Sequence, residues 1–242
     1  MHAPPHSKRP APHTSPLPPS HTAKATIKNL FSIDFCTLFS ILKVMKTHKN
    51  AIFDLCGVLL SWDSKALIRA LKEEDNTFPD NMDDIIDMPT WLQYDRGLFT
   101  RPEVVSSLSH IFDRRHLERF FDGIMEQFRP LESGMSLLRK KQKEGTRCFL
   151  LSNLGLEVKD FCLKTFPFLH TLNGCVFSCD IRLIKPDIAI YEYILNQYKL
   201  VPEETAFYDD LNINVMSART MGIDAVLHIP EPAMEAEELL AK

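Results

Sequence analysis

Short apolar runs alternate with longer amphipathic segments from Ala51 to Leu227, and this alternation constrains the fold more than any other feature of the chain. Five runs have the length and residue content of buried strands, and several of the segments between them have helical periodicity. The expected strands cover residues 51–53, 148–151, 175–177, 205–208 and 225–227. Strands that alternate with helices are typical of βαβ units. The sequence therefore predicts an α/β fold with a doubly wound parallel sheet.

The stretch from residue 64 to residue 128 interrupts this alternation. It contains no comparable buried strand, but it has helical spacings such as that of Leu67 and Leu71. We expect residues 64–128 to form a small α-helical cap, inserted after the first strand. The Rossmann-like core would then consist of residues 45–63 and 129–242.

The first 44 residues differ in composition from the rest of the chain. Seven of the sixteen prolines lie before residue 20, among histidines, serines and threonines, and such a stretch cannot bury a core. We interpret residues 1–44 as a disordered or accessory extension, or as sequence upstream of a start at Met45. The apolar run at residues 30–42 is shorter than the roughly 20 residues that a membrane span requires, so we expect no membrane partner.

Charge and cysteine content narrow the class of protein further. Lys and Arg number 28 against 32 Asp and Glu, which gives a net charge of -4 and no basic surplus for a phosphate backbone. We therefore expect no nucleic-acid partner. The six cysteines form no C-x-x-C pair, and several lie in apolar runs, as buried thiols do in a reducing compartment. This usage predicts a cytoplasmic protein.

Polar side chains follow three of the predicted strands. Asp54 follows the first, Ser152 and Asn153 the second, and Asp209 and Asp210 the fourth. Ligands of open parallel sheets bind at the carboxyl ends of the strands, so three carboxylates would gather in a small volume there. Carboxylates at such short distances repel one another unless a cation lies between them. Mg²⁺ prefers carboxylate oxygens as ligands. Taken singly, each Asp also fits a helix N-cap or a solvated turn.

Lys185 adds a positive charge to this edge of the sheet. It begins the sequence Lys185-Pro186-Asp187, which lies between the third strand and the next helix. A lysine there can offset the charges of a nucleophilic carboxylate and an incoming phosphate. Taken alone, Lys185 also fits a surface lysine before a helix.

Four short motifs occur in a fixed order along residues 51–229. They are Phe53-Asp54-Leu55-Cys56-Gly57-Val58-Leu59, Leu150-Leu151-Ser152-Asn153, Lys185-Pro186-Asp187, and Phe207-Tyr208-Asp209-Asp210-Leu211-Asn212-Ile213-Asn214. Together they resemble the motifs of the haloacid dehalogenase-like (HAD) hydrolase superfamily, of the subfamily IA type with a helical cap.

The resemblance implies a Mg²⁺-dependent phosphatase of a small phosphorylated metabolite. It implies that Asp54 attacks phosphorus and forms an aspartyl-phosphate, that Ser152 and Asn153 bind phosphoryl oxygens, and that Lys185 offsets charge. The metal ligands implied are Asp54, the backbone carbonyl of Cys56, Asp209 and Asp210, with Asn214 supporting the acidic loop.

Cys56 departs from the family pattern. Most phosphatases of the family carry an aspartate two residues after the nucleophile, where it protonates the leaving group and then activates water. A thiol with an ordinary pKa near 8.5 is a poor substitute, and losing acid-base help costs about 10² to 10⁴ in rate. One alternative is therefore a catalytically impaired binding or regulatory protein. Another is a phosphotransferase or dehalogenase on the same fold.

Four side chains of the first connection and the cap are candidates for substrate selection: Trp62, Trp91, Tyr94 and Arg96. The segment Tyr94-Asp95-Arg96-Gly97-Leu98-Phe99-Thr100 resembles a signature of bacterial sugar-1-phosphate phosphatases, which implies a sugar phosphate as one possible substrate. Aromatic side chains in a small helical insertion can equally form its core.

Overall fold

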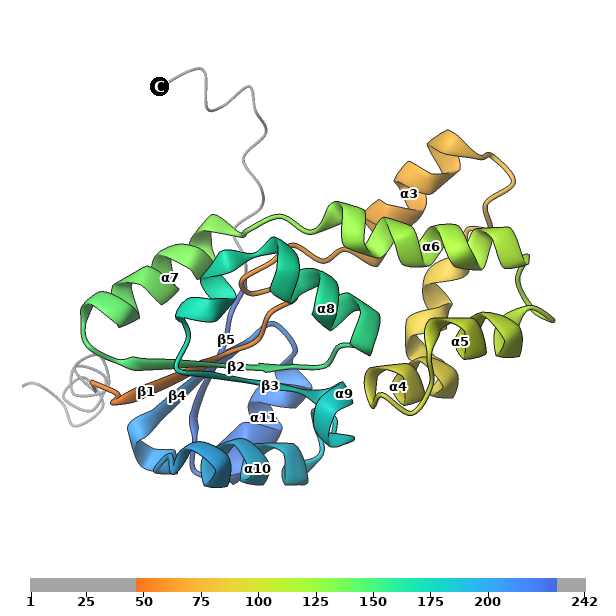
Figure 1. Cartoon of the computed structure of the whole chain (residues 1–242). Helices are drawn as coiled ribbons and strands as arrows, with labels where there is room; N and C mark the ends of the chain where they lie inside the picture. Colours follow the sequence, from red (N-terminus) through yellow and green to blue (C-terminus); the bar gives the residue numbers. More distant parts are fainter. Residues whose placement is uncertain (1–46, 230–242) are drawn as a thin grey trace, which may run out of the picture. The chain divides into compact units, whose positions relative to one another are not determined.

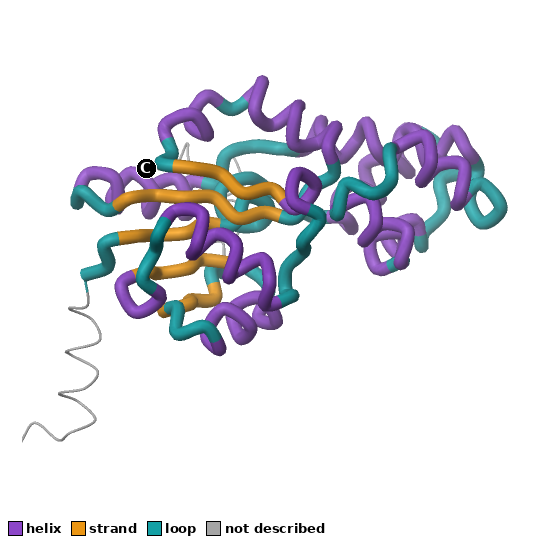
Figure 2. Tube along the Cα trace, turned by 60° about the horizontal axis from the view of Figure 1, so that its bottom comes forward, coloured by secondary structure: helices purple, strands orange, loops and turns teal. Residues whose placement is uncertain are grey.

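The computed structural model describes residues 47–229, which form an α/β structure around one parallel sheet (Figures 1 and 2). The strands are β1 (Asn50–Phe53), β2 (Arg147–Ser152), β3 (Gly174–Phe177), β4 (Thr205–Asp209) and β5 (Asp224–Leu227). Their order in the sheet is β3-β2-β1-β4-β5, and all neighbours are parallel. The predicted doubly wound fold is confirmed, and each predicted run lies within a strand. The predicted extension, residues 1–44, lies outside the described residues.

Helices cover both faces of the sheet (Figure 1). The helices around the strands are α7 (Glu132–Lys143), α8 (Leu156–Thr165), α9 (Ser178–Ile181), α10 (Ile188–Tyr198) and α11 (Asn212–Thr220), with 3₁₀ turns η2 (Pro167–Thr171) and η3 (Pro202–Glu204). Consecutive side chains of β1 alternate between two buried clusters: Ala51 and Phe53 belong to one, and Ile52 to the other. Because both faces are covered, the central strands have consecutive apolar residues in their interior rather than apolar residues at alternate positions.

The connection between β1 and α7 is helical. It contains α3 (Ser64–Glu74), η1 (Met82–Asp87), α4 (Pro89–Asp95), α5 (Arg101–Leu108) and α6 (Arg114–Gln127). Three of these helices begin at capping residues. Asp63 accepts a 2.9 Å hydrogen bond from the backbone N–H of Ala66, Asp113 accepts one of 2.7 Å from that of Arg115, and Thr100 forms a capping box with Glu103. We propose that this helical segment acts as the cap expected at residues 64–128.

The two stretches of chain that enter and leave the helical segment are hydrogen-bonded to each other at Ser61. Its backbone N–H donates to the carbonyl of Arg129 at 2.8 Å, and its hydroxyl donates to the carbonyl of Gln127 at 2.8 Å. Arg101, on α5, makes ion pairs with Glu118 of α6 at 2.8 Å and with Glu157 of α8 at 3.2 Å. The inserted helices are therefore bonded both to one another and to the helices of the sheet.

A turn at the end of α4 packs against the loop after β2, the start of α9 and the loop between α9 and α10. We call Tyr94–Gly97 the docking turn. The hydroxyl of Ser178 donates to the backbone carbonyl of Asp95 at 2.6 Å, and Arg96 forms a 2.8 Å ion pair with Asp187. The latter follows Lys185 by two residues, so the docking turn is bonded to the loop that carries the predicted catalytic lysine.

Two glycines allow this close approach. Gly97 has a φ of +68°, and a Cβ there would collide with the backbone of Cys179. A Cβ at Gly155, before α8, would collide with the ring of Tyr94.

Among the described residues, none of the helices is long and apolar enough to cross a bilayer.

The Tyr94 hydroxyl is buried without a hydrogen-bond partner, and the structure offers a matched control. The Tyr191 hydroxyl is also buried, but it donates to the carbonyl of Asn214 at 3.0 Å. We expect Tyr94→Phe to raise the free energy of unfolding by about 1 kcal/mol, because an unsatisfied group is removed, and Tyr191→Phe to lower it by about 1 kcal/mol. Urea denaturation measures both, and a less stable Tyr94→Phe variant would contradict this account of the docking turn.

Candidate active site

Three carboxylates and one lysine meet at the carboxyl end of the sheet. Asp54 follows β1, Asp209 ends β4, Asp210 comes next, and Lys185 lies in the loop between α9 and α10. Oxygens of the three carboxylates lie within 4.8 Å of one another. They meet because β1 and β4 are neighbours in register, with Phe53 opposite Tyr208. This is the juxtaposition predicted from the strand ends.

Lys185 binds two of the three carboxylates. Its Nζ lies 2.8 Å from Oδ2 of Asp54 and 2.7 Å from Oδ2 of Asp209, and only 4% of the lysine is exposed. Within the described residues, Asp210 has no ion-pair partner. With all four groups ionised, the cluster carries two uncompensated negative charges, which are costly away from water.

This charge imbalance shifts the pKa values of the cluster. Burial raises the pKa of Asp54 to about 7, an effect that Lys185 opposes and that Asp209 and Asp210 reinforce. Burial, followed by the charge of Asp209, also raises the pKa of Asp210. Burial alone would lower the pKa of Lys185, but the charges of Asp209 and Asp54 outweigh it and raise that pKa above its ordinary value. In the protein without metal, Asp54 is therefore only partly ionised at pH 7.

The cluster fits a divalent cation. Its donors are hard carboxylate oxygens from three residues, and its excess charge equals that of one Mg²⁺ ion. Asp54, Asp209 and Asp210 would hold the metal. The backbone carbonyl of Cys56, two residues after Asp54, stays a predicted fourth ligand.

The acidic loop is held by groups beneath it. Oδ1 of Asp209 accepts hydrogen bonds of 2.9 Å from the amide of Asn214 and from the backbone N–H of Leu211. Gly57 has a φ of +76°, and a Cβ there would collide with the carboxylate of Asp210. The turn after the predicted nucleophile therefore leaves room for the acidic pair, and Asn214 lies where it supports that pair.

Ser152 and Asn153, at the end of β2, differ in their contacts. The Ser152 hydroxyl is buried and has no hydrogen-bond partner among the described residues. It borders the same cavity as Asp54, so it is available to a phosphoryl oxygen. The Asn153 amide instead donates to the carbonyl of Lys185 at 3.0 Å and accepts from its N–H at 2.9 Å. Asn153 thus positions the lysine backbone, and its binding of phosphate stays a prediction.

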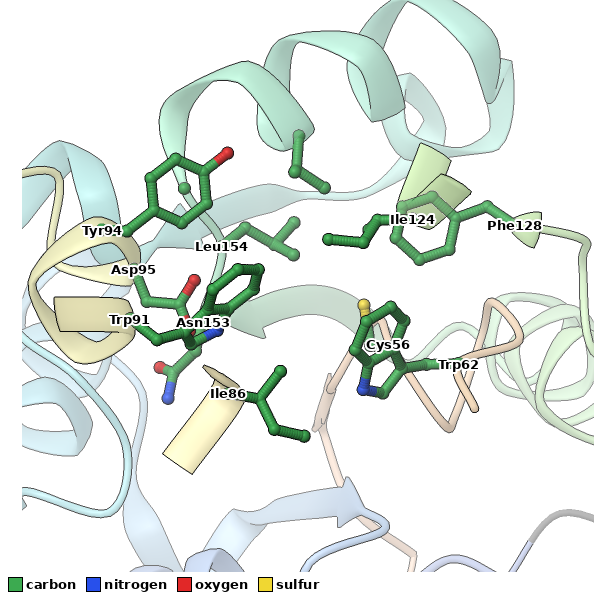
Figure 3. Close-up of a pocket in the computed structure, with 12 residues that line it drawn as sticks. Cys56, Trp62, Ile86, Trp91, Tyr94, Asp95, Ile124, Phe128, Asn153 and Leu154 are labelled. Carbon is green, nitrogen blue, oxygen red and sulfur yellow. The ribbon is translucent and has the colours of Figure 1, made fainter. Parts of the chain in front are cut away.

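Two adjoining cavities open beside the carboxylates. The larger, about 340 Å³, is bordered by Asp54, Ser152, Lys185 and Asp210. The smaller, about 100 Å³, is shown in Figure 3. Its apolar side chains come from the helical segment, its flanks and the β2–α8 region: Trp62, Ile86, Trp91, Ile124, Phe128, Leu154 and Val158. The cavity at the carboxylates therefore continues into a smaller one whose wall is mostly apolar.

The four candidates for substrate selection separate in the structure. Trp62 and Trp91 border both cavities, whereas Tyr94 borders the smaller one and packs its ring against Phe121 at a centroid distance of 5.2 Å. Arg96 borders neither cavity and pairs with Asp187. Two of the aromatic candidates thus face the space beside the nucleophile, and Arg96 belongs to the docking turn.

Two acidic residues of the cavity walls, Asp87 and Asp95, were not among the candidates from sequence, and Asp87 borders only the larger cavity. Asp95 borders both cavities, together with Cys56 and Asn153. Its position four residues after Trp91 on the same helix places both side chains on one face. That spacing was a usable signal, but only the structure shows that this face points toward the site.

The chain belongs to the haloacid dehalogenase-like hydrolase family, whose model matches residues 51–228. The resemblance read from the four motifs is therefore confirmed, and the protein is a hydrolase of that family.

Individual relatives agree with this assignment. The sesquiterpene phosphatase astK of Aspergillus oryzae is 28% identical over 197 residues, which is 80% of this chain and 95% of the relative. The bifunctional epoxide hydrolase 2 of Mus musculus is 40% identical over 124 residues, 50% of this chain but only 21% of the relative. The HAD family enzyme bt-2542 of Bacteroides thetaiotaomicron, solved in complex with magnesium and inorganic phosphate, has a TM-score of 0.61 at 22% identity. It covers 79% of this chain and 98% of its own.

The raised pKa of Asp54 predicts how stability depends on pH when no metal is bound. Its carboxyl loses its proton near pH 4 in the unfolded chain and near pH 7 in the folded one. Between these values the folded state holds more protons, so stability falls as pH rises through this window. We expect Asp54→Asn to melt at a higher temperature than the parent at pH 8 in EDTA, and this advantage to shrink at pH 5.

Calorimetry of both proteins checks this, with Glu73→Gln, an exposed carboxylate on α3, as the control that changes neither profile. An Asp54→Asn variant that melts at a lower temperature than the parent at pH 8 without metal would show that the ionised Asp54 carboxylate does not destabilise the fold.

Proposed function

We propose that the protein is a Mg²⁺-dependent phosphatase of a small phosphorylated metabolite, with Asp54 as the nucleophile. The observation that carries the proposal is the Lys185 ammonium bound between Asp54 and Asp209, beside a third carboxylate. The magnesium and phosphate in bt-2542 support it by analogy of fold, and astK supports the choice of a phosphate ester.

The residues suggest a two-step reaction. Asp54 is held by the backbone N–H of Leu55 at 2.7 Å and by Lys185, so its carboxylate is fixed before substrate arrives. It attacks phosphorus, the bond to the ester oxygen breaks, and an aspartyl-phosphate forms. Water then attacks that phosphorus and releases Asp54 and inorganic phosphate. Lys185 and the Ser152 hydroxyl stabilise the phosphoryl oxygens in both steps. Mg²⁺ bound at the three carboxylates would offset their charge and that of the phosphate.

We infer further that the alcohol part of the substrate is apolar. The smaller cavity is walled mostly by aromatic and aliphatic side chains, and two of its polar side chains already have partners within the protein. The Asn153 amide holds Lys185, and the Trp91 side chain hydrogen-bonds to Asp95. Most of this wall could not hydrogen-bond the hydroxyls of a sugar, and burying hydroxyls without partners is costly. An isoprenoid or other alkyl monophosphate suits this wall better than a sugar phosphate, and the sesquiterpene phosphatase relative points the same way.

A second candidate is a binding or regulatory protein that retains the metal site but turns over slowly. Cys56 favours it, because burial raises the pKa of its thiol well above the ordinary value and leaves it a very weak acid. Such a protein would bind Mg²⁺ and phosphate without hydrolysing esters.

Hydrolysis with and without Mg²⁺ separates the two candidates. We expect the parent to release phosphate from 4-nitrophenyl phosphate only with Mg²⁺, and Asp54→Asn to fall to the background rate, because the nucleophile is lost. Peptide mass spectrometry after an acid quench would locate a phosphoryl group on Asp54. Metal binding without turnover in the parent would favour the second candidate instead.

The apolar wall predicts substrate preference. We expect kcat/KM for farnesyl monophosphate to exceed that for glucose 1-phosphate, and Ile124→Asn to reduce this ratio roughly tenfold or more, since it places an amide against the alkyl group. The matched control is Ile111→Asn, at a side chain that is 52% exposed and outside both cavities. A ratio that favours the sugar, or that the two substitutions change equally, would contradict the assignment of this wall.

A further inference from the structure

The proposed reaction lacks an acid at the position that the family most often uses. When the ester bond breaks, the leaving alkoxide needs a proton, and an alkyl alcohol makes this need acute. A thiol, as at Cys56, has an ordinary pKa near 8.5 and is a poor substitute for that acid. Asp54 and Asp210 belong to the predicted metal site, and Lys185 is engaged with two carboxylates. The proton must come from another group beside the cavities.

Asp95 is placed for this role. It borders both the larger cavity, which contains Asp54, and the smaller cavity, where we place the alcohol part of the substrate. The ester oxygen joins the phosphoryl group to the alcohol part, so it would lie where the two cavities meet. Figure 3 shows Asp95 beside Trp91 and Asn153 on one side of the smaller cavity, with Cys56 on the other.

The main chain of Asp95 is anchored to the sheet side of the molecule. Its carbonyl accepts the 2.6 Å hydrogen bond from Ser178, and the same hydroxyl accepts from the backbone N–H of Leu154 at 2.9 Å. The Asp95 carboxyl accepts hydrogen bonds from the backbone of Gly155 and the side chain of Trp91. No ion pair to Asp95 occurs within residues 47–229, so no fixed cation holds it in the charged form.

The surroundings of Asp95 suit a carboxyl group that both donates and accepts a proton. Burial raises its pKa to about 7, and the two hydrogen bonds only partly offset this. Both protonation states are therefore populated near neutral pH, which is the condition for efficient acid-base catalysis.

We propose that Asp95 is the general acid and base of this enzyme and takes the place of the aspartate that Cys56 replaces. In the first step Asp54 bonds to phosphorus, the ester bond breaks, and Asp95 gives its proton to the leaving oxygen, which departs as the alcohol. In the second step the Asp95 carboxylate takes a proton from the attacking water, and the bond from Asp54 to phosphorus breaks. Asp95 ends protonated, as it began. This inference rests on the proposed phosphatase function.

The test uses two esters that differ in their need for an acid. An alkyl monophosphate such as farnesyl monophosphate needs a proton at the leaving oxygen, whereas 4-nitrophenyl phosphate releases a stable phenolate. With the full chain and Mg²⁺, we expect Asp95→Asn to lower kcat/KM for the alkyl ester by about 10² to 10⁴. It should leave kcat/KM for the aryl ester nearly unchanged, because this constant reports the steps up to transfer of the phosphoryl group to Asp54 and not the later hydrolysis, in which Asp95 acts as the base. Asp95→Glu, which retains an acid, should keep part of the alkyl activity. The control is Asp84→Asn, at an exposed carboxylate of η1 outside both cavities, which should change neither rate.

A second substitution separates a chemical role from a structural one. Cys56→Asp restores an acid at the usual place, so the double variant Cys56→Asp/Asp95→Asn should recover alkyl turnover lost in Asp95→Asn. Equal losses on both esters, no loss on either, or no recovery in the double variant would overturn the role of Asp95. If the parent hydrolyses neither ester with Mg²⁺, the proposed function fails, and the inference fails with it.

Discussion

The buried ammonium of Lys185 between Asp54 and Asp209 is the interaction on which the rest of the site depends. One positive charge cannot balance three carboxylates, so with all of them ionised the folded chain would concentrate two uncompensated negative charges at the carboxyl end of the sheet, where solvent is largely excluded. Strand order creates this concentration by placing β1 beside β4. Asn153 holds the lysine backbone and Asn214 holds Asp209, so neighbouring residues preserve the imbalance rather than relieve it. A bound divalent cation would balance these charges.

The docking turn links this charged edge to the apolar cavity. It brings Trp91 and Asp95 over the site and is bonded, through Arg96 and Asp187, to the loop of Lys185. Substrate preference and proton transfer would therefore depend on the same short segment. Two glycines, Gly97 and Gly155, permit the close contact that this arrangement needs.

The sheet and the carboxylate cluster could be predicted from the sequence, because strand length and alternation with helices are local patterns and parallel strands end at a common edge. The hydrogen-bond and ion-pair partners of individual side chains could not be predicted, since they depend on contacts between segments far apart in the chain. Arg96 was a candidate for substrate binding, yet it pairs with Asp187, and the Asn153 amide is occupied by Lys185. Asp95 lies in the segment 94–100, which resembles a phosphatase signature. No local sequence pattern, however, shows which wall of a cavity a helix of the cap forms.

Calorimetric titration of Mg²⁺ tests the central claim, that the uncompensated carboxylates form one divalent-cation site, most directly. The informative variant is Asp210→Asn, because this carboxylate takes part in no ion pair among the described residues and its removal leaves the pairs of Lys185 intact. The account predicts one Mg²⁺ per chain in the parent and an affinity lower by at least about tenfold in the variant. Equal Mg²⁺ affinity in the two proteins, or no binding in the parent, would contradict it.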